Sequence, residues 1–188
     1  MNLECSRKDL LDALNLASAA SSMRTAMPIL QTVRLTAKDS GLALLGCDSE
    51  MWAGRRILAK VQAEGTICVT AALFRDLVAK LPEGNVTLCL ENGNFFIRTA
   101  MSEWRMLALP AEDFPEMPAV EGRSELRLNM GEFRHSIDGV AFAVADDSSR
   151  PILTGVLLGY NGAVLTLVAT DTHRLAVRKI ERTGIGSD

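Results

Sequence analysis

The chain has 188 residues, with 20 Lys and Arg against 23 Asp and Glu, and a formal net charge of −3. Apolar residues make up 48% and charged residues 23%, close to the globular average, which excludes a disordered chain. The near balance of charge excludes a wholly cationic nucleic-acid binder but leaves room for one basic face.

The N-terminus carries charges at Glu4, Arg7, Lys8 and Asp9, so it lacks the apolar segment of a signal peptide. No apolar run approaches the roughly 18 residues of a membrane span. The four cysteines form no CxxC pair and lie in strand-like stretches, which is typical of buried thiols in a reduced compartment. We therefore expect a cytoplasmic protein that contacts no membrane and holds no metal or other cofactor.

The first 109 residues repeat one order of elements. Residues 2–6 predict a strand, and Ser6 with Asp9 predicts the start of a helix by the capping-box pattern. Alternating apolar residues then predict three strands, at 29–38, 42–48 and 52–60. The order returns as a strand at 65–69, a helix at 71–81 and three strands that end at residue 109. Residues 1–109 are thus predicted to form two βαβββ units.

A third unit follows, and it overlays the first with a constant shift of 123 residues. Asn129 and Glu132 fall on the cap formed by Ser6 and Asp9. Eleven of the thirty residues 28–57 are identical after the shift, whereas chance gives about two. The sequence therefore predicts an α+β protein of repeated βαβββ units, one complete domain plus half of a second. The expected boundaries are a first domain at 1–115, a linker at 116–123 and a truncated second domain at 124–188.

Asp48 and Asp171 are related by this shift, and each precedes Ser or Thr. A pair of repeat-related aspartates is one way to build the dyad of an acid hydrolase. The alternative is that each carboxylate closes a turn between two strands through its own side chain. The run around His173 does not predict nucleophilic catalysis, because consecutive strand residues point to opposite faces.

His173 and Arg174 interrupt an apolar region that also contains Leu153 and Leu175. Polar groups at the rim of an apolar surface are typical of a peptide-binding pocket. An ordinary strand edge would show the same pattern, so composition alone leaves both interpretations open.

Four stretches resemble the bacterial DNA polymerase III beta subunit, the sliding clamp. They are Met-Pro-Ile-Leu at 27–30, Leu-Pro-Ala-Glu-Asp-Phe-Pro at 109–115, Arg-Pro-Ile-Leu-Thr-Gly-Val at 150–156 and Ala-Thr-Asp-Thr-His-Arg-Leu-Ala at 169–176. The resemblance runs along the whole chain in register, but it covers only the N-terminal half of a typical family member.

The resemblance implies the DNA-clamp fold, in which two full-length chains close head to tail around duplex DNA. It implies a non-catalytic processivity subunit of a DNA-directed DNA polymerase. The partners it implies are double-stranded DNA, the DNA polymerase III catalytic subunit, the clamp loader and other proteins with a clamp-binding motif, with a homodimer in the full-length form. This chain then resembles a truncated fragment of the clamp.

The resemblance also assigns residues to roles. Arg24, Ser149 and Arg150 match DNA-contacting positions. Trp104 and Met106 match apolar positions of the ring interface. The partner-peptide pocket is matched by Leu153, Thr170, Thr172, His173, Arg174 and Leu175, although Thr172 stands where the family usually has Gly.

Three other functions stay open from the sequence. One is a hydrolase built on Asp48 and Asp171. Another is a stand-alone peptide-binding scaffold unconnected with DNA. The last is a decoy that competes with a complete clamp.

Overall fold

The computed structural model describes residues 1–21, 25–119, 126–147, 149–181. The chain divides into two compact units, Met1–Ala119 and Val120–Asp188, and each is described by itself below. Residue 116, predicted to begin the linker, lies inside the N-terminal unit. No helix in the described part of the chain is long and apolar enough to cross a membrane.

The N-terminal unit contains two βαβββ repeats, as the sequence predicts. The first repeat consists of β1 (Asn2–Ser6), α1 (Arg7–Ala19), the 3₁₀ helix η1 (Pro28–Gln31), β2 (Thr32–Lys38), β3 (Gly41–Cys47) and β4 (Trp52–Ala63). The second repeat consists of β5 (Gly65–Thr70), α2 (Ala71–Lys80), β6 (Asn85–Glu91), β7 (Asn94–Arg98) and β8 (Glu103–Leu107).

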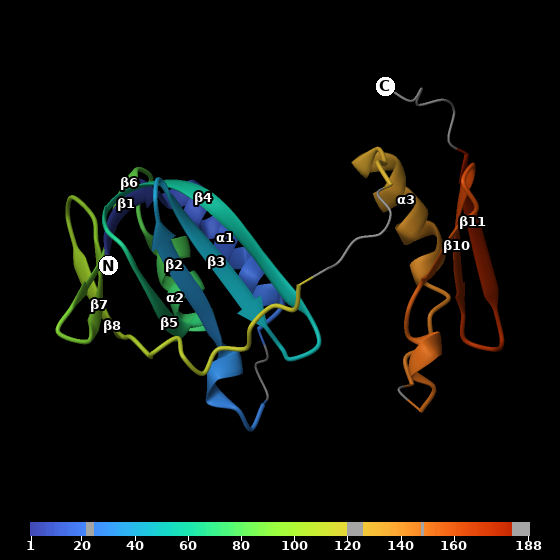
Figure 1. Ribbon diagram of the computed structural model, residues 1–188, viewed down its shortest axis with the longest axis horizontal. Coiled ribbons are helices and arrows are strands. Elements are labelled where there is room, and N and C mark those ends of the chain that lie inside the picture. Colours follow the sequence, from blue (N-terminus) through green and yellow to red (C-terminus); the bar gives the residue numbers. More distant parts are fainter. Residues whose placement is uncertain (22–24, 120–125, 148, 182–188) are drawn as a thin grey trace. The chain divides into compact units, whose positions relative to one another are not determined.

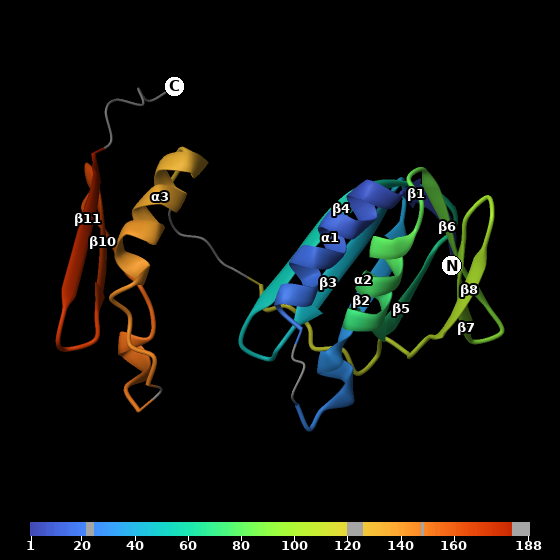
Figure 2. The ribbon, with the colours of Figure 1, turned by 180° about the vertical axis from the view of Figure 1, so that it is seen from behind.

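The eight strands form one antiparallel sheet in the order β5-β2-β3-β4-β1-β6-β7-β8. The two repeats exchange strands within it, because β1 pairs with β6 and β5 pairs with β2. Two hydrogen bonds between Cys68 and Leu109, of 2.9 and 2.8 Å, then join β5 to the chain just after β8. The sheet is therefore nearly closed, and α1 and α2 lie side by side against it (Figures 1 and 2).

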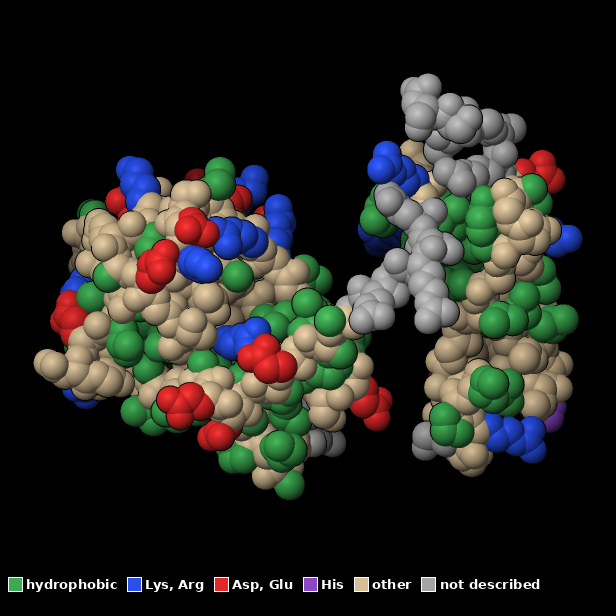
Figure 3. All heavy atoms as spheres, in the orientation of Figure 1, with side chains coloured by type: hydrophobic (Ala, Val, Ile, Leu, Met, Phe, Trp, Pro, Cys, Tyr) green, Lys and Arg blue, Asp and Glu red, His purple; other side chains and the backbone are tan. Residues whose placement is uncertain are grey.

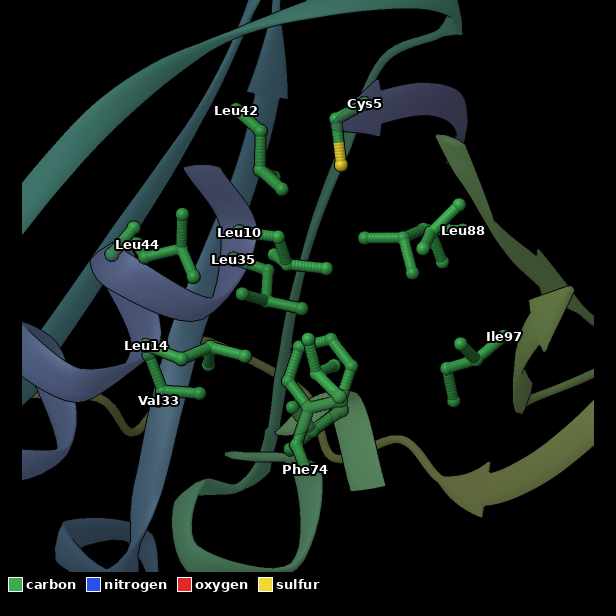
Figure 4. Packing of buried hydrophobic residues seen from close by; sticks show 14 of the residues in the cluster. Cys5, Leu10, Leu14, Val33, Leu35, Leu42, Leu44, Phe74, Leu88 and Ile97 are labelled. Atoms are coloured by element: carbon green, nitrogen blue, oxygen red, sulfur yellow. The ribbon is translucent and has the colours of Figure 1, made fainter. Parts of the chain in front are cut away.

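Both repeats contribute to one apolar core. Leu10 and Leu35 of the first repeat and Phe74, Leu88 and Ile97 of the second point toward one another (Figure 4). Phe74 also meets Phe95 edge to face, with ring centroids 5.4 Å apart. This joint core means that neither repeat buries its apolar face alone.

Glycine allows α1 to approach the sheet closely. A Cβ atom on Gly46 would lie 1.8 Å from the carbonyl oxygen of Ala17, so no larger residue fits between α1 and β3. All four cysteines are free and buried, as the sequence predicts. Burial raises the pKa of Cys5 to about 12, which keeps that thiol protonated and unreactive.

A second, smaller apolar cluster lies on the other face of the sheet, under residues 109–116, which we call the strap. Phe114 is only 3% exposed and packs with Leu30, Cys47 and Cys68. The indole N–H of Trp52 donates to the carbonyl oxygen of Pro115 at 3.4 Å. Outside the cluster, the Arg34 guanidinium forms an ion pair with Glu116 at 3.3 Å and lies 5.1 Å from the centre of the Phe114 ring. The strap is therefore part of the N-terminal unit.

The C-terminal unit contains the third repeat. Its elements are α3 (Met130–Ala141), the 3₁₀ helix η2 (Pro151–Leu153), β9 (Leu157–Tyr160), β10 (Val164–Thr170) and β11 (Leu175–Glu181). The strand order is β11-β10-β9, and α3 packs on β10 and β11. Among the described residues before α3, 126–129 form no strand.

The structure confirms the 123-residue shift. It carries β3 onto β10, and the pairing of Leu35 with Leu44 onto that of Leu158 with Leu167. The side chains of Ser6 and Asn129 accept hydrogen bonds from the amides of Asp9 and Glu132, which places the two predicted helix caps.

The joint core makes a prediction about stability. Replacing the fully buried Leu35 by Ala should lower the free energy of unfolding by about 2–5 kcal/mol, because a cavity is left in a packed interior. The matched change Leu58→Ala, at a side chain 83% exposed on β4, should cost less than about 0.5 kcal/mol. Both tryptophans of the chain lie in the N-terminal unit, so tryptophan fluorescence in a urea titration follows this unit alone. Equal losses in the two variants would contradict the shared core.

Candidate functional site

The predicted peptide-binding residues gather at the turn between β10 and β11. Asp171 shapes this turn, because its Oδ1 accepts hydrogen bonds from the amides of His173 and Arg174, both at 2.9 Å. The Arg174 and His173 amides hold the pKa of the Asp171 carboxyl below its usual range. Asp171 is thus an ionised group that closes the turn.

The first repeat builds the same turn from Asp48. Its Oδ1 accepts from the amides of Glu50 at 3.0 Å and Met51 at 2.7 Å, and these amides, Met51 first, lower the pKa of the carboxyl. A catalytic dyad needs two carboxyls that share a proton. Each of these carboxylates instead binds its own backbone, so the geometry supports the turn interpretation and not the hydrolase.

Thr172 adopts a left-handed backbone conformation, with φ of 79°. Its counterpart Ser49 has φ of 83°. Glycine adopts this region without cost, whereas a β-branched side chain is strained there. The geometry of the turn therefore gives a physical reason for a glycine at this position, and Thr172 bears a local strain.

An apolar groove lies between η2, β9 and β10. Its volume is about 430 Å³. Two predicted pocket residues, Leu153 and Thr170, line it, and the Thr170 hydroxyl donates to the carbonyl oxygen of Arg174 at 2.7 Å. The remaining lining residues, which the sequence analysis did not single out, are Ile152, Gly155, Val156, Leu157, Val168 and Ala169.

A polar hollow of about 400 Å³ adjoins the groove at Leu153, which lines both. It brings together residues predicted for two different roles: Ser149 and Arg150 for DNA, Thr172 and His173 for the partner peptide. These two pairs are far apart in the sequence, and no sequence pattern predicted that they would line one hollow.

Three carboxylates also line the hollow, those of Asp146, Asp147 and Asp171. The amide and hydroxyl of Ser149 both donate to the Asp147 carboxylate, at 2.8 and 2.6 Å. The hollow therefore carries more negative than positive charge, which opposes phosphate binding.

Arg174 and Leu175 follow these residues in the chain but line neither the groove nor the hollow. The Arg174 Nε binds Asp171 Oδ2 at 2.8 Å, and its guanidinium lies 5.8 Å from the centre of the exposed Phe142 ring. Leu175 is 66% exposed at the start of β11. The sequence analysis did not identify Phe142, because nothing in the sequence distinguishes it from any residue that follows a helix.

The remaining predicted site residues lie elsewhere. Arg24 is outside the described residues. Met106 is buried in the core of the N-terminal unit, and Trp104 packs partly against that core. The exposed positions of β8 are Glu103, Arg105 and Leu107, none of which the sequence analysis assigned to an interface.

The N-terminal unit contains a counterpart of the groove. The 123-residue shift carries Leu30 and Cys47 onto Leu153 and Thr170. In the first repeat these two residues pack under the strap, with Phe114 buried against them. The groove of the third repeat is therefore the equivalent of a surface that binds a phenylalanine presented by a turn, since the Phe114 amide donates to the Ala111 carbonyl oxygen at 3.2 Å.

Comparison with known families gives two matches in sequence order. Residues 1–118 match the N-terminal domain of the DNA polymerase III beta subunit, and residues 127–185 match its central domain.

Individual relatives agree with these matches. The beta sliding clamp of Synechocystis is 36% identical over 94% of this chain and 48% of its own length. The crystal structure of the DNA polymerase III beta subunit from Pseudomonas aeruginosa has a TM-score of 0.91, with 31% identity over 96% of this chain and 50% of that one. A sliding clamp from the same species bound to griselimycin has a TM-score of 0.91 and 30% identity, over 97% of this chain and 50% of that one. The chain thus spans about half the length of the relatives it matches.

The strain at Thr172 predicts the effect of a substitution. Thr172→Gly should stabilise the C-terminal unit by up to about 1 kcal/mol, because relief of an unfavourable φ exceeds the added entropy of glycine in the unfolded chain. Hydrogen exchange of the β10 and β11 amides, read by mass spectrometry, measures this change. Ser49→Gly is the matched control in the N-terminal unit and should leave those amides unchanged. Faster exchange in Thr172→Gly would contradict the assignment of strain.

Proposed function

The chain belongs to the DNA polymerase III beta subunit family, and we propose that it contributes to DNA replication as the N-terminal half of a sliding clamp. The clamp confers processivity by enclosing duplex DNA and tethering the polymerase, without catalysing a reaction. An enclosed duplex slides because contacts to phosphates carry no base information. The proposed location is the cytoplasm, where the chromosome of a bacterium lies.

One observation carries the tethering role: the groove of the third repeat is open, while its counterpart in the first repeat is filled by the strap. A surface that buries Phe114 of its own chain in one repeat has the shape and apolar character to bind a similar side chain of a partner in another. We propose Leu153, Thr170 and Leu175 as the apolar contacts. Thr172, His173 and Arg174 are proposed to supply the polar rim.

The proposed partners of the complete clamp are the catalytic subunit of DNA polymerase III, the clamp loader and other proteins with a clamp-binding motif. For the homodimeric ring, β8 is the proposed edge, with Trp104 and Met106 stabilising the strand from the inside. Its exposed Leu107 is then the apolar side chain that β8 presents outward.

The proposed DNA contacts are Arg24, Ser149 and Arg150. Of the two that the structure describes, Arg150 is the one with a positive charge for a phosphate. Ser149 is uncharged, and its amide and hydroxyl already donate to Asp147. The neighbouring carboxylates weaken even that contact. Enclosure, rather than affinity at this loop, is therefore the proposed source of DNA retention.

The tethering role predicts weak peptide binding. A fluorescent peptide ending in a Gln-x-x-Leu-Phe motif should bind the chain with a dissociation constant above about 10 µM, because an open groove buries only part of the two apolar side chains. Leu153→Ala should weaken binding about tenfold, equivalent to roughly 1.4 kcal/mol. Fluorescence anisotropy measures both values.

The control for this experiment is Leu58→Ala, which removes an exposed leucine from the other unit. It should leave the affinity unchanged. Submicromolar binding to the unaltered chain, or equal affinity in Leu153→Ala, would contradict the proposed pocket.

The chain should bind linear duplex DNA weakly and with a shallow dependence on salt. The two arginines among the proposed contacts, each contributing about 0.9 to the slope of log affinity against log salt, leave little binding at physiological salt. Arg150→Ala should reduce that slope by about 1. Arg56→Ala is the matched control, because Arg56 is an exposed arginine on β4 near Asp39, and it should have no effect. Binding that persists at high salt would contradict the proposed contacts.

A further inference from the structure

The strap is held on the sheet at its start and by one buried side chain near its end. Leu109 is joined to Cys68 of β5 by two backbone hydrogen bonds, of 2.9 and 2.8 Å. Residues 110–116 are all described, and no backbone hydrogen bond joins them to a strand. Phe114 is the only buried residue among them. Acidic and hydrophobic side chains lie along the strap on the face that Figure 3 shows. The strap beyond Leu109 therefore depends on the docking of one phenylalanine.

The surface under Phe114, which we call the seat, is formed by Leu30, Cys47 and Cys68. These three residues lie on η1, β3 and β5, next to β2 in the sequence or in the sheet. Pairing with β2 fixes both β3 and β5, and no residue of the seat belongs to the strap. The seat is therefore a preformed apolar site that stays in place when the strap leaves it.

The strap shows which chemistry the seat recognises. The ring of Phe114 fills the apolar surface, and the Arg34 guanidinium lies 5.1 Å from the ring centre. The Trp52 indole N–H donates to the carbonyl oxygen of Pro115 at 3.4 Å. Arg34 also binds the carboxylate of Glu116 at 3.3 Å, and that side chain is 87% exposed. The ligand of the seat therefore has the pattern Phe-Pro-Glu, with a carboxylate two residues after the ring.

We propose that the seat is a second binding site of this chain, closed by the strap, for a partner peptide that carries the pattern Phe-Pro-Glu. In most molecules the strap occupies the seat, because its tether gives Phe114 a high effective concentration there. A segment with one buried anchor and few backbone hydrogen bonds opens locally without unfolding of the core. The minor fraction with the strap released binds the partner, whose apparent affinity falls in proportion to that fraction. The proposal does not depend on the role in replication.

The groove of the third repeat is not equipped for the same ligand. The 123-residue shift carries Arg34 onto Leu157 and Trp52 onto Leu175. Neither leucine can pair with a carboxylate or donate to a carbonyl oxygen. The two surfaces share an apolar floor but differ in the polar groups beside it, so a Phe-Pro-Glu peptide should prefer the seat.

Labelling of the buried thiols measures release of the strap in the full chain. Cys47 and Cys68 lie in the seat, whereas Cys5 lies in the core of the N-terminal unit. Phe114→Ala should increase the rate at which iodoacetamide modifies both seat thiols by about tenfold or more, and leave the rate at Cys5 unchanged. Mass spectrometry of the digested chain reads each rate. Glu112→Ala, at an exposed residue of the strap, is the control and should have no effect. Unchanged rates at the seat thiols, or equal acceleration at Cys5, would overturn the proposal.

A fluorescent peptide with the sequence of residues 109–117 tests binding to the seat by anisotropy. It should bind Phe114→Ala about tenfold more tightly than the unaltered chain, because the strap no longer competes for the seat. Replacing the phenylalanine of the peptide with alanine should abolish binding. Arg34→Gln in the Phe114→Ala background should weaken binding about three- to fivefold at low salt, because the ion pair and the contact with the ring are both lost.

Two further substitutions in the Phe114→Ala background locate the bound peptide. Leu30→Ala, in the seat, should weaken binding about tenfold, because apolar contact with the ring is lost. Leu153→Ala, its counterpart in the third repeat, should leave the affinity unchanged. Binding lost only in Leu153→Ala would place the peptide in the groove of the third repeat, which would overturn this proposal and leave the tethering role intact. No binding to Phe114→Ala, or equal affinity for the unaltered chain, would overturn the proposal as well.

Discussion

The exchange of strands between two βαβββ repeats is the constraint on which this structure depends. Each repeat has one apolar sheet face that its single helix covers only in part, and an edge strand with unpaired backbone groups. In the N-terminal unit both deficits are removed at once, since β5 pairs with β2 of the other repeat and Phe74 fills the shared core. The described part of the C-terminal unit has the helix and three strands of one repeat, and it leaves Leu158 half exposed.

A second consequence of the repeat is that scaffold and function separate. The turns at Asp48 and Asp171 have the same hydrogen bonds and the same left-handed residue, so their shape is set by the carboxylate and not by the residues that follow. Those residues differ completely: Glu50, Met51 and Trp52 in one turn correspond to His173, Arg174 and Leu175 in the other. Their differing chemistry is therefore free to serve recognition.

The sequence predicted the fold well because its signals are local and repeated. Helix caps at Ser6 and Asn129 and an ungapped shift require no knowledge of distant contacts, and the observed β3 and β10 are related by that same shift. Alternation placed Trp104 and Met106 on one face of β8 but could not say that this face meets the core. Contacts between segments that are far apart in the chain leave no pattern in the sequence, so they could not be predicted either. The strap over Cys47 and the hollow that joins Arg150 to His173 became visible only in the structure.

The strap also explains why an open groove suits a tether. Phe114 is linked to its binding surface by the same chain, so its docking loses little translational freedom, and the strap remains bound. A separate partner that enters the equivalent groove at Leu153 loses its translational and rotational freedom, which costs about 4–15 kcal/mol. Under the proposed function, an apolar surface of this kind binds its own chain durably and a separate peptide only transiently. Such transient binding would let successive partners use one site.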